Sequence, residues 1–552
     1  MITTNEYSYI LLMALCATVV WSWLATTGRW TKSQLPLPPS PISDPFIGHM
    51  RTLMRVSDLP RSYKKFSEEL RSDIISFKLP GQTIIVLNSV EAAENLLSKR
   101  SSIYSDRPKS NTTMATSNRL LGWGSNTGVL PYGERWRAQR RMTHELLHKR
   151  ASEDLWPTIV RNSRLALQQL LENPSKFESH FRRMAGSSII KSVYGYEATA
   201  SNDALFRAVS DAVDGFAQAI VTSNFYVNII PWMQYIPSWL PGAQWKRQAF
   251  AWRLQTEQML NVPYDWTRDQ MRTGTAPPSM MRQLLARYTE EPSEEEKDTM
   301  RWAAGTLFAA GTDTTVSNAL ILIAAMAMHP EIQAKAQHEV DSVLCGKRLP
   351  DMDDRQSMPY IQAIVKEVLR WRSVTPIGVA HACIEEDVYD RQSMPYIQAI
   401  VKEVLRWRSV TPIGVAHACI EEDVYKGYRI PKGATVIANQ WAMSNDEKVY
   451  TNPERFDPSR FLDPSTPEAP AFGFGRRSCP GIHMAHASLF MIVGGLAASF
   501  NIRPKCNSEG HPIPLTAEMK QNMLLSQPLP FEVDIEPRSE QHERLLRAWV
   551  DI

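Results

Sequence analysis

The chain has 552 residues with 61 basic and 58 acidic side chains, so its formal net charge is only +3. A charge this small for the length gives no indication of a nucleic-acid-binding protein. Its six cysteines are widely scattered, which predicts no disulfide or zinc framework and favours a reducing compartment for the body of the protein.

Residues 7–27 form an uncharged apolar stretch that is long enough to cross a membrane as a helix. Glu6 precedes it, and Arg29 and Lys32 follow it. This polarity favours a retained anchor with a lumenal N-terminus over the alternative of a cleaved signal peptide. We predict an anchor at 1–28.

A proline-rich stretch at 35–41 cannot continue a helix, so we predict an extended linker at 29–45 and one large folded domain at 46–552. Within that domain, residues 73–87 predict two short strands around Pro80 and Gly81, which begin a small sheet. Residues 151–290 are mostly helical in pattern and carry no catalytic motif.

A helical stretch rich in arginine follows the predicted strands. It places Trp136 and Arg140 four residues apart and therefore on one face of a helix. Its other arginines, Arg135, Arg137 and Arg141, are interpreted as a solvated basic face that could dock an acidic redox partner.

The stretch Phe225–Trp245 mixes tryptophan and tyrosine with three prolines. Aromatic residues of this kind settle at membrane interfaces, and broken helices there could form the mouth of an apolar substrate channel. Ordinary core packing explains the same composition, so both interpretations stay open.

Ser293 and Glu296 form a capping box, after which an uninterrupted helical pattern runs to Met328. Most of this helix is apolar and is expected to be buried. Its middle, residues 310–315, reads Ala-Gly-Thr-Asp-Thr-Thr, in which the threonine hydroxyls can bond back to the preceding turn and distort the helix. Phe308 and Ala309 beside it are candidate positions in an apolar pocket.

Residues 354–389 recur letter for letter at 390–425. Solenoid repeats diverge and continue along a chain, whereas this is one perfect tandem copy, which indicates a gene-model artefact or a recent duplication. Without one copy of 36 residues, the chain would have 552 − 36 = 516 residues.

The most specific motif is the loop that contains Cys479. Phe472, Gly475, Arg477 and Gly481 surround the cysteine at fixed spacing, and the glycines allow the backbone to turn tightly and approach a flat ligand. Nearby positive charge favours the thiolate, which binds soft iron. This spacing resembles the haem-binding signature of the cytochrome P-450 family.

The resemblance implies a mainly α fold with a small β subdomain, the cytochrome P-450 fold, preceded by one N-terminal transmembrane helix. It implies haem b as cofactor, with Cys479 as the proximal ligand to iron. In this family the Trp136 and Arg140 positions reach a haem propionate, and Asp313 and Thr314 match the acid and the hydroxyl of the oxygen-activating motif.

The duplicated stretch contains a Lys-Glu-x-x-Arg motif in each copy, which by resemblance pairs with Arg455 and braces the haem loop. We favour the second copy, Glu403 and Arg406, because it runs on into a predicted hairpin between residues 415–420 and 435–439. The first copy, Glu367 and Arg370, is the alternative.

The implied activity inserts one atom of O2 into a small apolar organic substrate by hydroxylation or epoxidation. The chain has no dinucleotide or flavin fingerprint, so the electrons would come from NADPH through a separate NADPH-cytochrome P-450 reductase at the endoplasmic reticulum membrane. Several segments resemble members of fungal secondary metabolism that act on terpenoid or aromatic compounds. Two alternatives are a haem-thiolate isomerase or dehydratase, and a haem protein disabled by the duplication.

Overall fold

The computed structural model describes residues 35–56, 58–108, 113–198, 203–220, 224–228, 230–358, 360–361, 364–365, 416–458, 460, 465–516, 518–519 and 526–549. The predicted anchor and both Glu-Arg pairs of the duplicated stretch lie outside these ranges.

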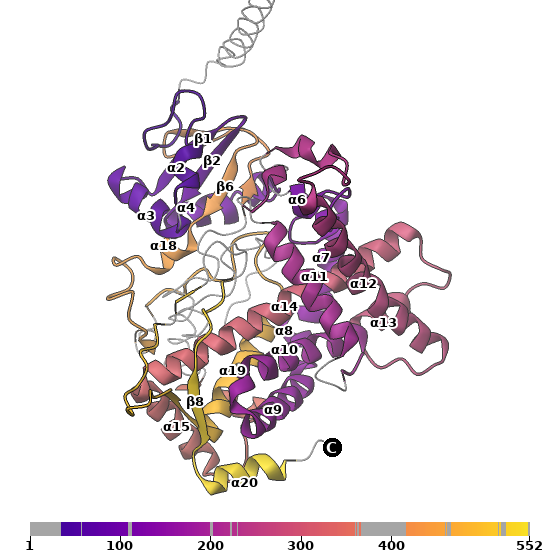
Figure 1. Cartoon of the computed structure of the whole chain (residues 1–552), viewed down its shortest axis with the longest axis vertical. Coiled ribbons are helices and arrows are strands. Elements are labelled where there is room, and N and C mark those ends of the chain that lie inside the picture. The colour runs from indigo at the N-terminus through magenta and orange to yellow at the C-terminus, as the bar shows by residue number, and fades with distance from the viewer. Residues whose placement is uncertain are drawn as a thin grey trace, which may run out of the picture.

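A small four-stranded sheet lies at the end of the molecule that holds the indigo start of the described chain (Figure 1). Strands β1 (Ile74–Leu79) and β2 (Gln82–Leu87) are antiparallel and pair Leu79 with Gln82, which confirms the predicted turn at Pro80 and Gly81. The sheet order is β1-β2-β6-β3, with β6 (Thr435–Ala438) parallel to β2 and β3 (His417–Ala418) antiparallel to β6. Two further pairs join β4 (Asp423–Tyr425) to β5 (Tyr428–Ile430) and β7 (Phe500–Pro504) to β8 (Val533–Pro537).

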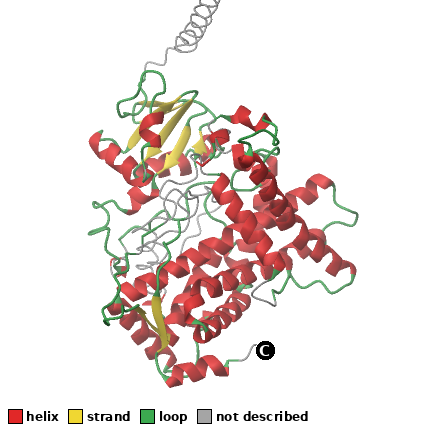
Figure 2. Ribbon diagram, in the orientation of Figure 1, coloured by secondary structure: helices red, strands yellow, loops and turns green. Residues whose placement is uncertain are grey.

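Helices form most of the described body, as Figure 2 shows, and this agrees with the predicted fold class. The longer helices are α3 (Leu59–Glu69), α7 (Glu134–Leu147), α9 (Trp156–Glu172), α10 (Phe177–Tyr194), α11 (Ala204–Ala219), α12 (Gln244–Arg272), α14 (Glu294–Met328), α15 (Pro330–Leu344), α19 (Ile482–Ser499) and α20 (Glu540–Ala548). The shorter helices and turns are α2 (Met50–Met54), α4 (Val90–Ala93), η1 (Glu94–Ser98), α5 (Ser101–Tyr104), α6 (Thr113–Thr116), η2 (Trp123–Ser125), α8 (Lys149–Glu153), η3 (Pro174–Lys176), η5 (Tyr226–Asn228), η6 (Pro231–Tyr235), α13 (Met280–Leu285), η7 (Met352–Gln356) and α18 (Gln440–Ser444).

The central helix is α14, which crosses the helical body from one side to the other (Figure 1). Its N-terminus has the predicted capping box between Ser293 and Glu296, and it ends at Met328 as predicted. The apolar side chains of α9, α10, α14, α15 and α19 share one large core. Among the described helices, α14 and α19 are long and apolar enough to cross a membrane, but 72% of each apolar window is buried inside the protein, as expected of core helices.

The described parts of the two identical copies occupy different places. The start of the first copy packs in the core, where Met358, Ile361 and Ile364 are fully buried. The end of the second copy supplies β3 and β4, so the predicted pairing with residues 435–438 is confirmed for the described residues.

Candidate active site

The cysteine loop leads directly into α19. Cys479 lies three residues before Ile482, the first residue of that helix, and its N–H donates to the carbonyl of Phe472 at 2.9 Å. Burial raises the pKa of the Cys479 thiol, whereas the backbone N–H of Gly481 and the Arg140 guanidinium oppose the rise. The positive end of α19 adds to the groups that favour a thiolate here.

The loop turns sharply at Gly475, which has a φ of +57°. A Cβ atom at this position would lie 2.2 Å from the backbone oxygen of Leu97, which a side chain could not avoid. Glycine is therefore required here both by the left-handed backbone and by the close approach of η1. Phe472, at the start of the loop, packs against the large core, with its ring 5.6 Å from that of His486.

Arg477 is almost fully buried, with 1% of its surface exposed. Its guanidinium donates to the backbone carbonyls of Ser105, Thr127 and Leu130 at 2.8–3.2 Å. It also lies 4.6 Å from the ring centroid of Trp136. Burial, followed by the nearby Arg107 and Arg140, holds the pKa of Arg477 well below its usual range.

The predicted pair on α7 faces the same loop. Trp136 is buried beneath Arg477, and Arg140 donates to the carbonyl of Ser478 at 3.0 Å. Burial lowers the pKa of Arg140 to about 10, although the neighbouring Cys479 opposes this. The structure thus brings Trp136, Arg140, Arg477 and Cys479 together.

Two further buried groups of this cluster were missed from the sequence. Arg107 donates to the carbonyls of Gly128 and Ala416, and burial lowers its pKa to about 9. His417 donates from Nδ1 to the carbonyl of Tyr104, and burial together with Arg107 lowers its pKa to about 3, so it is neutral. For His417 the sequence offered one signal, a histidine within an otherwise apolar strand. For Arg107 it offered none, because a single arginine outside a motif does not indicate a buried position.

This cluster fits a flat ligand that carries carboxylates beside a metal. The guanidinium groups of buried Arg107 and half-buried Arg140 both act on that of buried Arg477, and within the described residues Asp106 is the carboxylate that acts on Arg107 and Arg477. Buried cations without equal countercharge are costly, and an anionic ligand would compensate them. A thiolate donor adjoins the cluster, so the donor set suits a haem with its propionates.

A relay of contacts connects the cysteine loop to the long helix. Arg477 donates to the carbonyl of Thr127, whose N–H in turn donates to the hydroxyl of Thr306 on α14 at 3.3 Å. Asp313 and Thr314 follow Thr306 on that helix by two turns, about 10 Å along its axis. Two motifs far apart in the sequence therefore lie within one region of the fold.

Asp313 is buried, with its carboxylate bonded to the guanidinium of Arg182 on α10. Thr314 is half-buried, and its hydroxyl donates to the carbonyl of Ala310 at 2.8 Å. Thr312 and Thr315 bond back in the same way, as predicted. The expected distortion does not break the helix, which stays α-helical from Glu294 to Met328 because its neighbours pack against it on several sides.

Arg455 lies in the loop after α18, where its N–H donates to the carbonyl of Asn452 at 3.0 Å. Its predicted partners, Glu403 and Arg406 or the alternative Glu367 and Arg370, lie outside the described residues.

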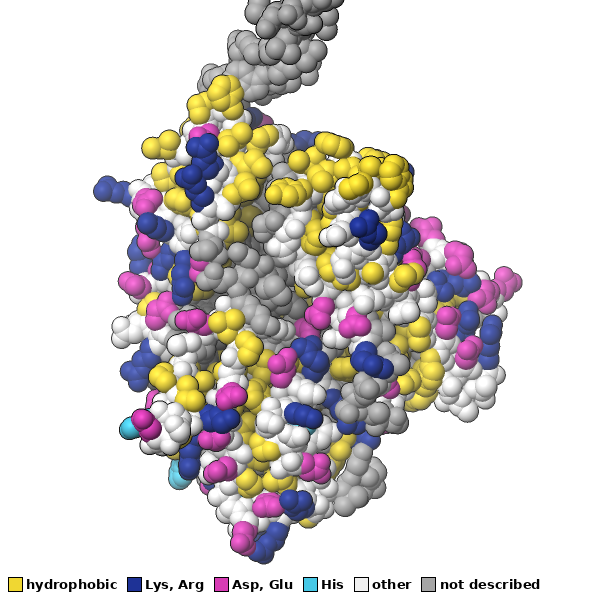
Figure 3. Space-filling model, in the orientation of Figure 1, with side chains coloured by type: hydrophobic (Ala, Val, Ile, Leu, Met, Phe, Trp, Pro, Cys, Tyr) yellow, Lys and Arg dark blue, Asp and Glu magenta, His cyan; other side chains and the backbone are white. Residues whose placement is uncertain are grey.

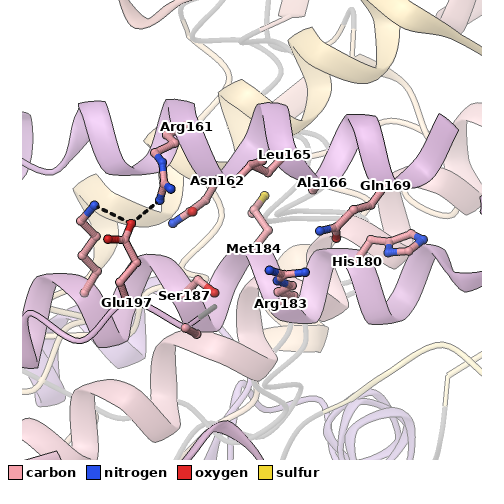
Figure 4. A pocket seen from close by; sticks show the side chains of 12 residues that line it. Arg161, Asn162, Leu165, Ala166, Gln169, His180, Arg183, Met184, Ser187 and Glu197 are labelled. Atoms are coloured by element: carbon pink, nitrogen blue, oxygen red, sulfur yellow. Dashed lines mark hydrogen bonds and ion pairs between the residues drawn. The ribbon is translucent and has the colours of Figure 1, made fainter. Parts of the chain in front are cut away.

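A separate groove of about 440 Å³ runs between α9 and α10. Figure 4 shows Arg183 and His180 of α10 reaching into it opposite Gln169 of α9. The groove contains none of the predicted site residues, and its surface cations Arg161 and Lys191 share the carboxylate of Glu197. It therefore does not belong to the candidate active site.

The sequence model of the cytochrome P450 family matches residues 38–390 and 386–535, and the two matches meet inside the duplicated stretch. The chain is 36% identical to cytochrome P450 monooxygenase COX2 of Coprinopsis cinerea, over 98% of this chain and 95% of that protein. It is 34% identical to cytochrome P450 monooxygenase ppsD of Aspergillus oryzae, over 93% and 91% respectively. It is 33% identical to tryptamine 4-monooxygenase of Psilocybe cyanescens, over 94% and 96%.

These full-length matches agree with the mainly helical fold and with the loop around the candidate cysteine. Proteins of this family bind haem iron through a cysteine thiolate and use O2 to oxidise organic substrates. The chain therefore belongs to the cytochrome P450 family and is a haem-thiolate monooxygenase.

Proposed function

We propose that Cys479 is the thiolate ligand of the haem iron and that the enzyme oxidises a small apolar compound of fungal secondary metabolism. The overall reaction is RH + O2 + NADPH + H⁺ → ROH + H2O + NADP⁺, or the corresponding epoxidation. Bound haem supplies the oxygen chemistry, because a thiolate ligand favours cleavage of the O–O bond. The observation that carries the proposal is the half-buried thiol of Cys479 beside the buried guanidinium of Arg477, whose pKa is held well below its usual range by burial and by the neighbouring Arg107 and Arg140.

The residues around the loop have distinct roles in this proposal. Arg477 and Arg140, with Trp136, bind and orient the propionates, and Arg107 and neutral His417 complete that end of the site. Gly475 and Gly481 keep the loop close to the ligand, while Phe472 anchors it in the core. The hydrogen bonds and burial of these side chains support fixed orientations.

Asp313 and Thr314 are proposed to deliver the protons that the reaction consumes. The carboxyl of Asp313 is buried, and burial raises its pKa above the usual value, the direction that makes it easier for this carboxyl to take up a proton. The hydroxyl of Thr314 is half-buried, so it can pass a proton on to the substrate cavity.

The substrate class is proposed from the relatives. One of them is named for oxidation of tryptamine, and others are monooxygenases of fungi. Together with the buried apolar residues Phe308 and Ala309 on α14, this favours an aromatic or terpenoid substrate.

We also propose a single-pass protein of the endoplasmic reticulum membrane, with an anchor at 1–28, a linker at 29–45 and a cytosolic catalytic domain at 46–552. The side chains of Tyr226, Trp232, Tyr235 and Trp239 are 63–76% exposed, so core packing does not explain them. Figure 3 shows hydrophobic side chains gathered at the upper end of the molecule, the end that holds the small sheet in Figure 1. This surface would meet the lipid.

Electrons are proposed to come from NADPH-cytochrome P-450 reductase at the same membrane. Arg137 and Arg141 on α7 are exposed and could receive an acidic partner, while Arg135 is already paired with Asp298.

In the duplicated stretch, Glu403 and Arg406 are proposed to brace the haem loop with Arg455. An E403Q variant with low haem content beside a normal E367Q variant would support the second copy, and the reverse result would assign the role to the first.

The decisive experiment on the proposed function replaces Cys479 with Ser. We expect the wild type to give the thiolate-type Soret band in a reduced carbon-monoxide difference spectrum and C479S to lose both this band and product formation. C506S removes an exposed cysteine and serves as the control, with an unchanged spectrum. Retention of the band and of activity in C479S would refute the assignment.

The membrane surface is tested separately in a chain that lacks residues 1–34. We expect replacement of Trp232 and Trp239 by Ser to lower its binding to phospholipid vesicles in a sedimentation assay. Unchanged vesicle binding would remove the role proposed for this surface.

A further inference from the structure

The groove between α9 and α10 is lined by polar side chains from both helices. Four of them belong to α10: His180, Arg183, Ser187 and Lys191. Their intervals of three and four residues place them on one face of that helix. The side of α9 that faces them contributes Arg161, Asn162 and Gln169. Helices of a core normally meet through apolar stripes, so packing alone does not explain a polar seam of this length.

The groove has the size and the fixed walls of a small-molecule site. Its volume of about 440 Å³ lies within the range of known ligand pockets. Asn162 ties the two helices together, because its Nδ2 donates to the hydroxyl of Ser188 at 3.0 Å. Other side chains of α9 and α10 pack in the main core. The two walls are therefore held in position before any ligand binds.

Positive charge exceeds negative charge in this groove. Three of its described lining residues are cationic, namely Arg161, Arg183 and Lys191, and Glu197 is the carboxylate among them. Glu197 accepts hydrogen bonds from Arg161 at 2.5 Å and from Lys191 at 3.1 Å. Figure 4 shows Glu197 at one end of the groove and Arg183 nearer to the other. The lining thus has a surplus of two positive charges, which a dianion would balance.

Neutral hydrogen-bonding groups accompany these charges. The hydroxyl of Ser187 is buried and has no hydrogen-bond partner among the described residues. A buried hydroxyl without a partner is costly, and an oxygen of a ligand in the groove would satisfy it. His180 is held in place because its Nε2 donates to the carbonyl of Asn173 at 2.9 Å, and its ring reaches into the groove opposite Gln169 (Figure 4).

We propose that this groove binds a small, water-soluble phosphate monoester. The planar guanidinium of Arg183 matches two phosphate oxygens, and the hydroxyl of Ser187 donates to a third. A phosphate monoester carries about two negative charges at neutral pH, which equals the surplus of the lining. Leu165, Ala166 and Met184 supply an apolar wall for the organic part of the ligand. The site does not rest on the proposed function.

The position of the groove favours a soluble ligand over a lipid headgroup. In Figure 1, α9 and α10 lie in the half of the molecule away from the small sheet. The hydrophobic surface that is proposed to meet the lipid lies at the sheet end (Figure 3). A phosphate in the groove would therefore face the aqueous side.

The first test is isothermal titration of the purified holoenzyme with phenyl phosphate, in a buffer without phosphate or nucleotides. We expect saturable binding at one site in the wild type. R183Q should bind about 10- to 100-fold more weakly, because a charged, bidentate hydrogen-bonded pair is lost. R272Q removes an exposed arginine at the end of α12, outside the groove, and is the control with an unchanged affinity. S187A removes a single hydroxyl, should bind several-fold more weakly, and tests the same site if R183Q does not fold.

The second test probes the charge of the ligand. We expect E197Q to bind phenyl phosphate several-fold more tightly than the wild type, because Arg161 and Lys191 are then no longer neutralised by a carboxylate. Phenyl sulfate has a similar shape but a single negative charge, so it should bind more weakly than phenyl phosphate.

Each outcome has a distinct meaning. Absence of saturable binding, or equal affinities in the wild type, a folded R183Q and S187A, would overturn the site. Weaker binding in E197Q, or equal affinity for phenyl sulfate, would overturn a dianion as the ligand. Sedimentation with vesicles of phosphatidylcholine and phosphatidic acid that requires Arg183, without binding of phenyl phosphate, would overturn a soluble ligand. A normal thiolate-type spectrum in a protein that does not bind phenyl phosphate would leave the proposed function intact.

Discussion

Arg477 and Arg182 are both largely withdrawn from solvent, yet their surroundings differ. The bonds that Arg477 makes go to backbone carbonyls, whereas Arg182 contacts two carboxylates. Around Arg182 the protein therefore supplies two carboxylates, whereas around Arg477 the described residues place two further arginines and one carboxylate, Asp106. A buried cation without a nearby carboxylate is costly unless an anionic ligand binds beside it. The difference therefore favours a ligand-binding role for Arg477 and a side-chain partner for Arg182.

The largest effects should come from exchanging the two arginines for Leu. R182L leaves Asp313 buried without its partner and should cost about 3 kcal/mol in the free energy of unfolding, with haem still bound. R477L should weaken haem binding by about 10- to 100-fold, while in the apoprotein the relief of a buried cation partly offsets the loss of three hydrogen bonds to backbone carbonyls. Chemical denaturation and haem titration of the two variants measure this crossover, and parallel changes in both properties would contradict the comparison.

The next effect concerns the loop that carries the cysteine. G475A places a methyl group against the backbone oxygen of Leu97 and forces a left-handed conformation on alanine, which should cost about 2–3 kcal/mol. Haem affinity should fall with it, because the loop must move away from η1. G433A is a suitable control, since this glycine also has a positive φ but open space around its Cβ position. Equal losses in the free energy of unfolding of G475A and G433A would mean that backbone strain accounts for the whole effect and that the contact with Leu97 adds nothing.

The smallest effect involves Glu339 on α15, a half-buried carboxyl to which the described residues bring backbone N–H groups and no arginine. Burial raises the pKa of Glu339 on α15 to about 7, although it accepts hydrogen bonds from the backbone N–H groups of Tyr360 and Ile361. Because the folded pKa lies above the unfolded one, this group's contribution to stability is complete below about pH 4.5 and is lost as the pH rises through about 7.

E339Q should therefore match the wild type near pH 5 and be more stable by up to about 2 kcal/mol at pH 8, after allowance for partial exposure. Urea unfolding across this pH range measures the difference. A constant difference between wild type and E339Q would show that the carboxyl does not titrate in the folded protein.

Features of the fold that depend on neighbouring residues could be predicted from the sequence. The turn at Pro80 and Gly81, the capping box at Ser293 and the back-bonded threonines of α14 each depend on a few adjacent positions. The same holds for Trp136 and Arg140, since four residues along a helix put them on one face.

The rest of the site depends on long-range packing that no local pattern encodes. Arg107 and His417 reach the cysteine loop from a turn and from a strand, and Arg182 reaches Asp313 because a glycine lets two helices approach. A single arginine or histidine has no characteristic spacing to other motif residues. Its partner can therefore be identified only from the folded structure.

The identity of the two copies has a practical consequence for protein engineering. Removal of any 36 consecutive residues that start between positions 354 and 390 yields one and the same polypeptide of 516 residues. That shortened enzyme has a single Glu-Arg pair, so it can be made and assayed without first deciding which copy is surplus.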